Sequence, residues 1–256
     1  MKITAIQLNI QWLDAQANCQ RAEQLMDAAP ADTDLFVLPE MWATGFITTP
    51  TLQTAELSAL ALTWMKRQAH ERNAAIAGSL AIRQWPQVEA AETPAMWRNR
   101  FCFVKPDGTC HTYDKRNLFT YGGEQLTFSP GSERVVINYR GIRFMPQICF
   151  DLRFPETSRN FLSSPYDVLL YVANWPSSRR SAWDALLPAR AIENQAYCLG
   201  VNRTGADPQC LYNGGTSAID PYGLPLFRFD EREQIATFCV DKERLQHFRQ
   251  KFQVLK

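Results

Sequence analysis

The chain has 256 residues, of which 46% are hydrophobic and 12% aromatic, so it can bury a substantial core. Its 27 basic and 26 acidic residues give a formal net charge of +1. This balance provides no long-range field that would gather nucleic acid or an anionic membrane, and it favours a small-molecule or protein ligand.

Strand-like apolar runs recur along the whole chain, and helical stretches separate several of them. The expected strands cover residues 2–10, 34–40, 74–82, 100–108, 143–150, 167–174, 196–205 and 216–223. The expected helices cover residues 14–29, 54–72 and 181–196. Asp14 caps the first helix, the second follows Thr54, and the third carries Pro188 inside it or at a break.

Three of the expected strands, 34–40, 143–150 and 167–174, are continuously apolar, which is typical of strands covered on both faces. The stretches "KPDG" and "DPYG" are turns of the kind that joins exposed hairpins. Together these features predict a mixed α/β fold with helices packed over sheets. We find no internal repeat and no linker, and expect one domain over residues 1–256.

The N-terminus and the cysteines indicate a cytoplasmic protein. "MKITAIQLNI" alternates like a strand and contains neither the apolar segment nor the cleavage site of a signal peptide. No later apolar run approaches the ~20 residues that cross a bilayer. Seven cysteines, an odd number without a C-x-x-C pair, predict free thiols in a reducing compartment.

Three reactive residue types stand at or near the ends of expected strands: Glu40, Lys115 and Cys149. Taken singly, Glu40 and Lys115 are more often solvated, and a free cysteine is more often buried and inert. At Cys149, however, a strand ends, charged residues follow, and backbone N–H groups of such a turn can point at a developing oxyanion.

A nucleophilic thiol needs a base or a nearby cation. None of the three histidines, His70, His111 and His247, follows a strand end, so a Cys-His dyad is poorly supported. A glutamate base with a lysine ammonium would supply the same chemistry. Dispersed histidines without H-E-x-x-H or paired-Cys spacing offer no metal ligands, so we expect neither metal nor cofactor.

Three motifs carry a resemblance to a known family: "LPEMWATGF" (38–46), "YDKRNLF" (113–119) and "CFDLRFPE" (149–156). In this order and spacing they resemble the nitrilase superfamily of carbon–nitrogen hydrolases, and the likeness runs from residue 2 to about residue 240. The resemblance implies a four-layer α-β-β-α sandwich, a single carbon–nitrogen hydrolase domain over 1–256, and a homodimer paired by helices near the nucleophile.

The resemblance also implies a Glu-Lys-Cys triad. Glu40 would be the general base, Lys115 the cationic stabiliser, and Cys149 the nucleophile that forms a thioester. The backbone N–H of Phe150 would complete the oxyanion hole with Lys115. Glu124 matches a second glutamate that would orient the ammonium or assist proton transfer, although a plain loop carboxylate stays open.

One position departs from the family pattern. Asn117 stands where the family usually has a histidine, and because an amide does not titrate near neutrality, a proton relay there is disfavoured.

The motif "CFDLRFPE" resembles the corresponding motif of the omega-amidase branch more than that of true nitrilases, which typically carry Cys-Trp-Glu. Omega-amidases hydrolyse the terminal amide of short dicarboxylate monoamides, such as 2-oxoglutaramate or succinamate, to ammonia and the dicarboxylate. Arg153 would then pair with the free carboxylate of the substrate. The alternative is that Arg153 pairs with Asp151 or Glu156, both expected to be structural, and holds the turn.

The segment "NWPSSRR" falls where the family's pocket wall forms. Trp175 and Ser178 would close over a small amide substrate, although Trp175 as plain core filling stays open. Arg179 and Arg180 are further carboxylate candidates or solvated loop residues.

Three alternatives compete with the omega-amidase interpretation. A carbamoylase and an aliphatic nitrilase share the fold, and "CFDLR" with Arg153 makes both less favoured. A non-catalytic binding scaffold would be expected to have lost a triad residue, and all three are present.

Overall fold

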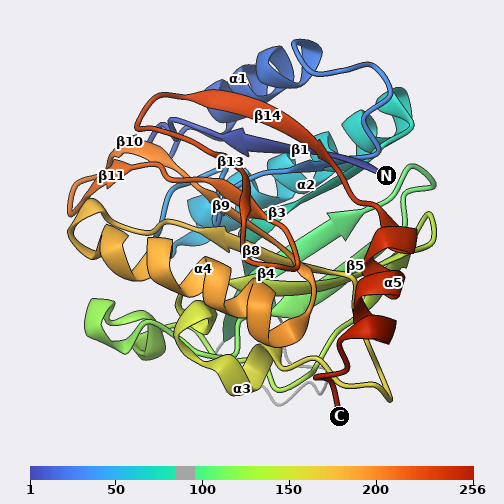
Figure 1. The fold of residues 1–256 in the computed structure, drawn as a ribbon. Helices are drawn as coiled ribbons and strands as arrows, with labels where there is room; N and C mark the ends of the chain where they lie inside the picture. The colour runs from blue at the N-terminus through green and yellow to red at the C-terminus, as the bar shows by residue number, and fades with distance from the viewer. Residues whose placement is uncertain (85–95) are drawn as a thin grey trace.

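The computed structural model describes residues 1–84 and 96–256, which form two six-stranded sheets (Figure 1). The first has the order β14-β1-β2-β3-β4-β5, from β1 (Lys2–Gln7), β2 (Leu35–Val37), β3 (Ala75–Gln84), β4 (Met96–Val104), β5 (Cys110–Asp114) and β14 (Gln234–Cys239). The second has the order β13-β12-β9-β8-β7-β6, from β6 (Ile137–Tyr139), β7 (Ile142–Ile148), β8 (Val168–Ala173), β9 (Tyr197–Asn202), β12 (Ser217–Ile219) and β13 (Pro225–Arg228). A separate hairpin pairs β10 (Thr204–Ala206) with β11 (Leu211–Asn213).

Helices cover the outer faces of both sheets, with α1 and α2 on one side of the molecule and α4 on the other (Figure 1). The described helices are α1 (Ala15–Asp27), α2 (Leu52–Arg72), α3 (Pro155–Ser158), α4 (Arg180–Asn194) and α5 (Lys242–Lys251). Asp14 caps α1 by accepting a bond from the amide of Ala17 at 2.9 Å. The second helix begins two residues earlier than expected, because Thr51 and Thr54 form a capping box. Pro188 lies inside α4.

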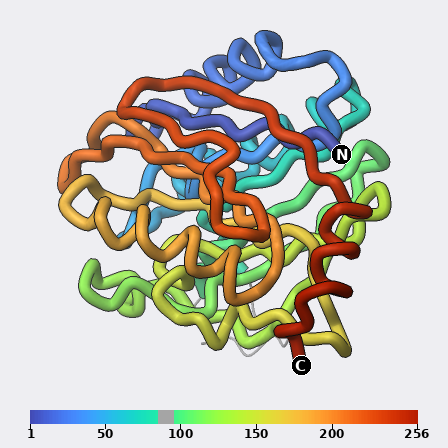
Figure 2. Tube along the Cα trace, in the orientation of Figure 1, coloured from blue at the N-terminus to red at the C-terminus, as the bar shows by residue number. Residues whose placement is uncertain are grey.

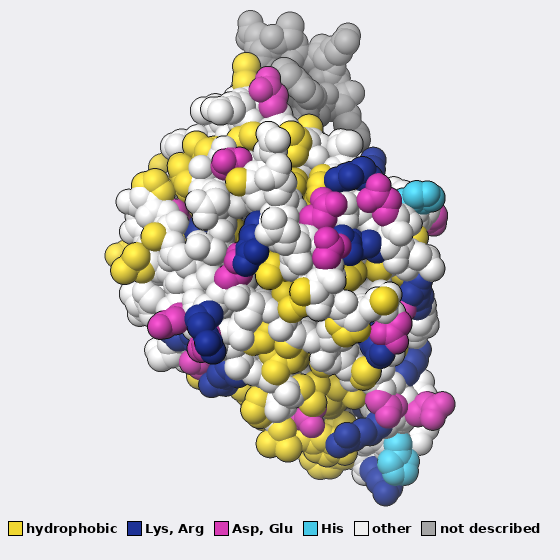
Figure 3. Space-filling view, turned by 90° about the horizontal axis from the view of Figure 1, so that it is seen from above, with side chains coloured by type: hydrophobic (Ala, Val, Ile, Leu, Met, Phe, Trp, Pro, Cys, Tyr) yellow, Lys and Arg dark blue, Asp and Glu magenta, His cyan; other side chains and the backbone are white. Residues whose placement is uncertain are grey.

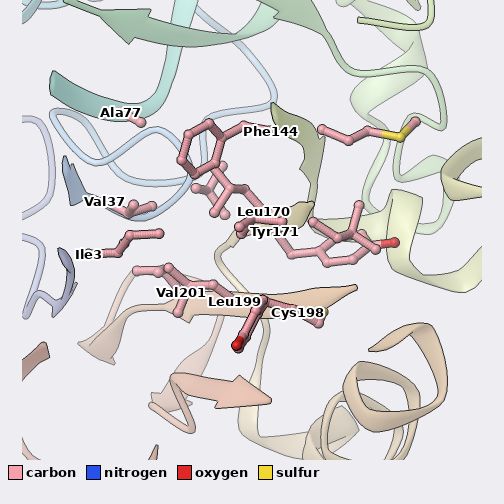
Figure 4. Close-up of a cluster of buried hydrophobic side chains, with 14 of the residues drawn as sticks. Ile3, Val37, Ala77, Phe144, Leu170, Tyr171, Cys198, Leu199 and Val201 are labelled. Atoms are coloured by element: carbon pink, nitrogen blue, oxygen red, sulfur yellow. The ribbon is translucent and has the colours of Figure 1, made fainter. Parts of the chain in front are cut away.

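The layers follow from the alternation of side chains along the first sheet. In β1, β2, β3 and β4 every second apolar residue faces the other sheet, whereas the residues between them pack with α1 and α2. Figure 4 shows Ile3 and Val37 of the first sheet beside Leu170 and Val201 of the second. This is the predicted four-layer α-β-β-α sandwich.

Both expected turns join hairpins. The "KPDG" turn links β4 to β5, with the amide of Lys105 donating to the carbonyl of Thr109 at 2.9 Å, and "DPYG" links β12 to β13. The expected strand 196–205 instead divides into β9 and β10 at Arg203. The Arg203 guanidinium is fully buried and donates to the backbone carbonyls of Ile10, Thr204 and Ala206.

The two ends of the sequence contribute neighbouring strands: β1 and β14 run side by side in Figure 2 and pair antiparallel from Lys2↔Cys239 to Gln7↔Gln234. On the face seen in Figure 3, acidic and basic side chains are interspersed among uncharged ones, in keeping with the near-neutral sequence. Within the part of the chain that the structure describes, no helix is long and apolar enough to span a membrane.

Candidate active site

The predicted site residues emerge from the ends of strands in both sheets. Glu40 lies just beyond β2, Lys115 follows β5 directly, and Cys149 follows β7 directly. Glu124 opens the short 3-10 helix η2 (Glu124–Leu126). All four are buried, and Cys149, at 9% exposure, is the most accessible of them. The structure thus brings together the four residues that the motifs had suggested.

The ammonium of Lys115 holds two carboxylates. Its Nζ lies 2.9 Å from Oε1 of Glu40 and 2.9 Å from Oε2 of Glu124. The backbone amide of Phe119 also donates to Glu124, at 2.6 Å, so this carboxylate is fixed from two sides. The arrangement holds the positive charge of Lys115 beside Glu40, where it could stabilise a neighbouring oxyanion.

A buried amide that the sequence analysis missed bridges the same two carboxylates. Nδ2 of Asn99, in β4, donates to Oε1 of Glu40 at 2.7 Å and to Oε1 of Glu124 at 3.1 Å. Its Oδ1 accepts from Oγ of Ser79 at 2.9 Å. The signal was present, because Asn99 occupies an inward register that otherwise carries Trp97 and Phe101.

The nucleophile candidate occupies a strained backbone position. Cys149 has φ +47°, in the left-handed region that non-glycine residues seldom adopt, and it opens the 3-10 helix η3 (Cys149–Arg153). Phe150 is the second residue of this helix, so its amide has no partner within the helix and is available to an oxyanion. The Cys149 sulfur lies 4.0 Å from the backbone carbonyl of Asn174.

Asn174, which follows β8, ties the base candidate to the nucleophile. Its backbone amide donates to Oε2 of Glu40 at 2.8 Å, and its side-chain Nδ2 donates to the backbone carbonyl of Glu40 at 2.5 Å. Both carboxylate oxygens of Glu40 are therefore held in place, one by Lys115 and Asn99 and the other by Asn174.

The electrostatics keep the thiol protonated. Burial raises the pKa of Cys149 well above its ordinary value; the neighbouring Glu40 carboxylate raises it further, and Lys115 opposes them. Burial lowers the pKa of Lys115, but the charges of Glu124 and Glu40 prevail and raise it above its ordinary range. At neutral pH the sulfur would therefore need a base in order to act as a nucleophile, and the nearby Glu40 carboxylate is suited to that task.

Behind the nucleophile, Asp151 holds the turn in place. Its carboxylate accepts from the amide of Ile148 at 2.9 Å, from the hydroxyl of Tyr113 at 2.8 Å, and from both the backbone and side-chain nitrogens of Asn117, at 2.8 and 2.9 Å. The structural role expected for Asp151 agrees with this geometry. Asn117, at the family's histidine position, serves here as a hydrogen-bond donor.

Cys149 opens onto a cavity of about 600 Å³. The cavity also collects the four residues predicted to contact substrate: Phe150, Arg153, Trp175 and Ser178. Its further lining residues are Phe46, Phe119, Tyr121, Gly122, Asn174, Pro176, Arg179, Asp207, Gln209, Cys210 and Tyr212. The last four come from the β10–β11 hairpin, which the sequence analysis did not connect with the site.

The structure distinguishes the surroundings of Arg153 and Arg180, two arginines that the sequence left as candidates for binding a substrate carboxylate. Among the described residues, no carboxylate lies within ion-pair distance of Arg153; its guanidinium lies 5.4 Å from the centre of the Trp175 ring. Arg180, in contrast, forms an ion pair with Asp184 at 2.8 Å and is not among the residues that line the cavity, which argues against a role in binding a substrate carboxylate. Trp175 is 3% exposed, so it both packs in the core and lines the cavity.

Comparison with known proteins settles the family. The family model described as carbon–nitrogen hydrolase matches residues 2–250. The chain belongs to the carbon–nitrogen hydrolases. The predicted membership of the nitrilase superfamily is thereby confirmed, and the protein is an enzyme of the hydrolase class.

Two curated carbon–nitrogen hydrolases and one solved structure show how similar the relatives are. Omega-amidase YafV of Escherichia coli (strain K12) is 40% identical over 98% of this chain and 94% of its own length. The 2-oxoglutaramate amidase of Bacillus subtilis (strain 168) is 32% identical over 93% of this chain and 90% of its own. A crystal structure of a CN-hydrolase superfamily protein from Xanthomonas campestris, with an arsenic adduct in its active site, superposes with a TM-score of 0.90 at 35% identity, covering 98% of this chain and 94% of that one.

Proposed function

We propose that this carbon–nitrogen hydrolase is an omega-amidase that hydrolyses the terminal amide of short dicarboxylate monoamides, such as 2-oxoglutaramate and succinamate. The observation that carries the proposal is a buried Cys149 opening onto a cavity in which the Arg153 guanidinium has no acidic partner among the described residues. An unpaired arginine beside an amide-cleaving centre is suited to a substrate that carries its own carboxylate. The names of the Escherichia coli and Bacillus subtilis relatives support this substrate class.

The proposed mechanism assigns one proton acceptor and one covalent intermediate. Glu40 takes the proton of the Cys149 thiol as the sulfur attacks the amide carbon, and the C=O electron pair moves onto oxygen. The N–H of Phe150 and the Lys115 ammonium stabilise this oxyanion. Glu40 then returns the proton to the leaving nitrogen, the C–N bond breaks, and ammonia departs from a thioester.

Hydrolysis of the thioester uses the same groups in reverse order. Glu40 takes a proton from a water that attacks the acyl carbon, the C–S bond breaks, and the proton returns to sulfur. In this scheme Glu124 and Asn99 position Lys115 and Glu40 without touching the substrate, which their hydrogen bonds support.

The remaining expectations belong to the same proposal. We infer that residues 1–256 act as one carbon–nitrogen hydrolase domain, supported by the family match over 2–250. The seven cysteines are all free of disulfides, which supports a reducing, cytoplasmic location. The chain is proposed to work as a homodimer and to need no cofactor.

The deciding experiment measures ammonia release from 2-oxoglutaramate, with succinamate, glutamine, a nitrile and N-carbamoyl amino acids as parallel substrates. Turnover of the two monoamides, lost in Cys149→Ala and kept in Cys239→Ala, is the expected result, because Cys239 is an exposed cysteine outside the cavity. Release of carbon dioxide from carbamoyl compounds with no monoamide turnover would point to a carbamoylase instead, and turnover of the nitrile alone to a nitrilase.

A further inference from the structure

One side of the cavity is an aromatic wall that extends from the site lysine towards solvent. Nζ of Lys115 lies 5.3 Å from the ring centre of Phe46, which is 6.3 Å from that of Phe119, which is 5.9 Å from that of Tyr121. Tyr121 is 87% exposed and marks the outer end of this wall. The guanidinium of Arg179 lies over the two outer rings, 4.8 Å from Phe119 and 5.3 Å from Tyr121.

Arg179 faces the cavity, and the described residues provide no acidic partner for it. Among the described residues, no Asp or Glu oxygen lies within ion-pair distance of its guanidinium. Asp207 is the carboxylate of the cavity lining, and it accepts bonds from the amides of Gln209 and Cys210 and from the hydroxyl of Tyr212. Because stacking occupies the face of a guanidinium, its N–H edge stays available for a carboxylate.

The backbone of Arg179 is hydrogen-bonded to the Trp175 indole, the same ring on which the Arg153 guanidinium packs. Nε1 of Trp175 donates to the backbone carbonyl of Arg179 at 2.8 Å, while the Arg153 guanidinium lies over the same indole. Trp175 is buried and packs against Trp183, with ring centres 5.4 Å apart. The buried Trp175 side chain therefore contacts both arginines at the same cavity.

We propose that Arg179 is a specificity-determining residue, which forms with Arg153 a two-arginine site for the free carboxylate of the substrate. The inference rests on the proposed function and extends it, since it assigns the selection of anionic amides to a second arginine on the aromatic wall. The apolar rings around the site lower the local dielectric and strengthen such a pairing.

The test compares two amides of equal chain length, glutaramate, which ends in a carboxylate, and pentanamide, which ends in a methyl group. Loss of a hydrogen bond to a charged group should raise the KM for glutaramate in Arg179→Gln by about tenfold to hundredfold. The kcat for glutaramate and the kcat/KM for pentanamide should change little, because neither measures recognition of the carboxylate. Arg179→Lys should recover part of the loss, and Arg228→Gln, which removes an arginine from exposed strand β13, should match the wild type.

The double variant tests whether the two arginines share one carboxylate. If they do, Arg153→Gln with Arg179→Gln should raise the KM by less than the product of the single effects. An unchanged KM for glutaramate in Arg179→Gln would overturn the proposal. Equal losses of kcat/KM for glutaramate and pentanamide would also overturn it, because they would mean that Arg179 only stiffens the aromatic wall.

Failure of the proposed function would give a different pattern. If the wild type hydrolyses no monoamide, titration calorimetry with glutarate and 2-oxoglutarate still measures carboxylate binding at this site. Weaker binding to Arg179→Gln than to the wild type and Arg228→Gln would support the two-arginine site, whereas equal binding would overturn it.

Discussion

The charge of Glu40 has two opposing effects on Cys149. As a base it is proposed to accept the proton of the thiol, yet as a neighbouring anion it raises the pKa of that thiol and keeps the proton on sulfur. The thiol therefore rests in its protonated, less reactive form. Lys115 acts in the other direction, because its ammonium lowers the pKa of Cys149.

Glu40→Gln should therefore separate reactivity of the thiol from catalysis. Without the anion, the pKa of Cys149 falls, and alkylation of this cysteine by iodoacetamide near neutral pH should become about threefold to tenfold faster, since a lower pKa also weakens the nucleophile somewhat. Ammonia release should nevertheless be lost. Peptide mass spectrometry of Cys149 over time measures the effect.

Glu124→Gln serves as the comparison for this experiment. Glu124 raises the pKa of Cys149 less than Glu40 does, so its neutral variant should be alkylated only slightly faster than the wild type. Slower alkylation of Glu40→Gln than of the wild type would contradict the assignment of Glu40 as the anion that holds the proton on the thiol.

The motifs suggested Glu40, Lys115, Cys149 and Glu124 as site residues, but they did not point to Asn99 and Asn174, which donate hydrogen bonds to Glu40. Glu40, Lys115 and Cys149 stand in contiguous motifs, and their positions could be predicted from these alone. Asn99 shares the inward register of Trp97 and Phe101 in its strand, but this alternation predicts only that its side chain is buried and not what it contacts. Its contacts to Glu40 and Glu124 depend on tertiary pairing, which a single sequence does not reveal.

At the scale of elements, the turn η3 depends on one buried carboxylate. Asp151→Ala would leave four donors, from Ile148, Tyr113 and Asn117, without their acceptor. Since unsatisfied buried groups each cost about 1–3 kcal/mol, the free energy of unfolding should fall by about 3 kcal/mol or more. Activity should fall too, because this turn carries Cys149.

Urea denaturation measures the loss, and Glu156→Ala provides the matched control. Glu156 lies five residues further along, in α3, and is exposed, so its removal should change the free energy of unfolding by less than about 0.5 kcal/mol. Equal stability of the Asp151 and Glu156 variants would rule out the proposed role of Asp151.

Long helices with clear periodicity could be predicted, whereas short edge strands could not. The first and third expected helices agree with α1 and α4 to within two residues at each end, because helical periodicity is a local feature and, in α1, Asp14 caps the first turn. Strand β13 begins at Pro225 and is mostly exposed, and β11 spans only Leu211–Asn213, so neither carries a clear alternation. The β10–β11 hairpin that lines one side of the cavity could therefore not be predicted from the sequence.

At the scale of the whole molecule, an apolar surface supports the proposed homodimer. Ile192 of α4 and the β12–β13 turn expose neighbouring hydrophobic side chains, with Ile192 at 54%, Tyr222 at 48% and Leu224 at 63%. A Cβ on Gly223 would meet the Ile192 side chain at 2.6 Å, which shows that turn and helix touch. Such patches on soluble proteins commonly mark interfaces.

Leu224→Asp should therefore weaken the homodimer and shift the sedimentation coefficient towards that of a monomer. Leu52→Asp is the matched control, because Leu52 is also 63% exposed but lies at the start of α2, on the opposite helical layer. Dissociation of the Leu52 variant with an intact Leu224 variant would place the interface on the other side of the molecule. A monomeric wild type would reject the homodimer itself.

The proposed base, Glu40, and the proposed cation, Lys115, follow strands of the first sheet, and the Cys149 thiol follows a strand of the second, with Asn174 donating hydrogen bonds to Glu40 across the boundary. Neither sheet by itself contains all the residues of the proposed reaction centre. During refolding, helices and strands can therefore form while the protein is still inactive. The rate at which ammonia release returns after dilution from denaturant would therefore report the docking of the two sheets. Far-ultraviolet circular dichroism reports secondary structure and is nearly insensitive to this step.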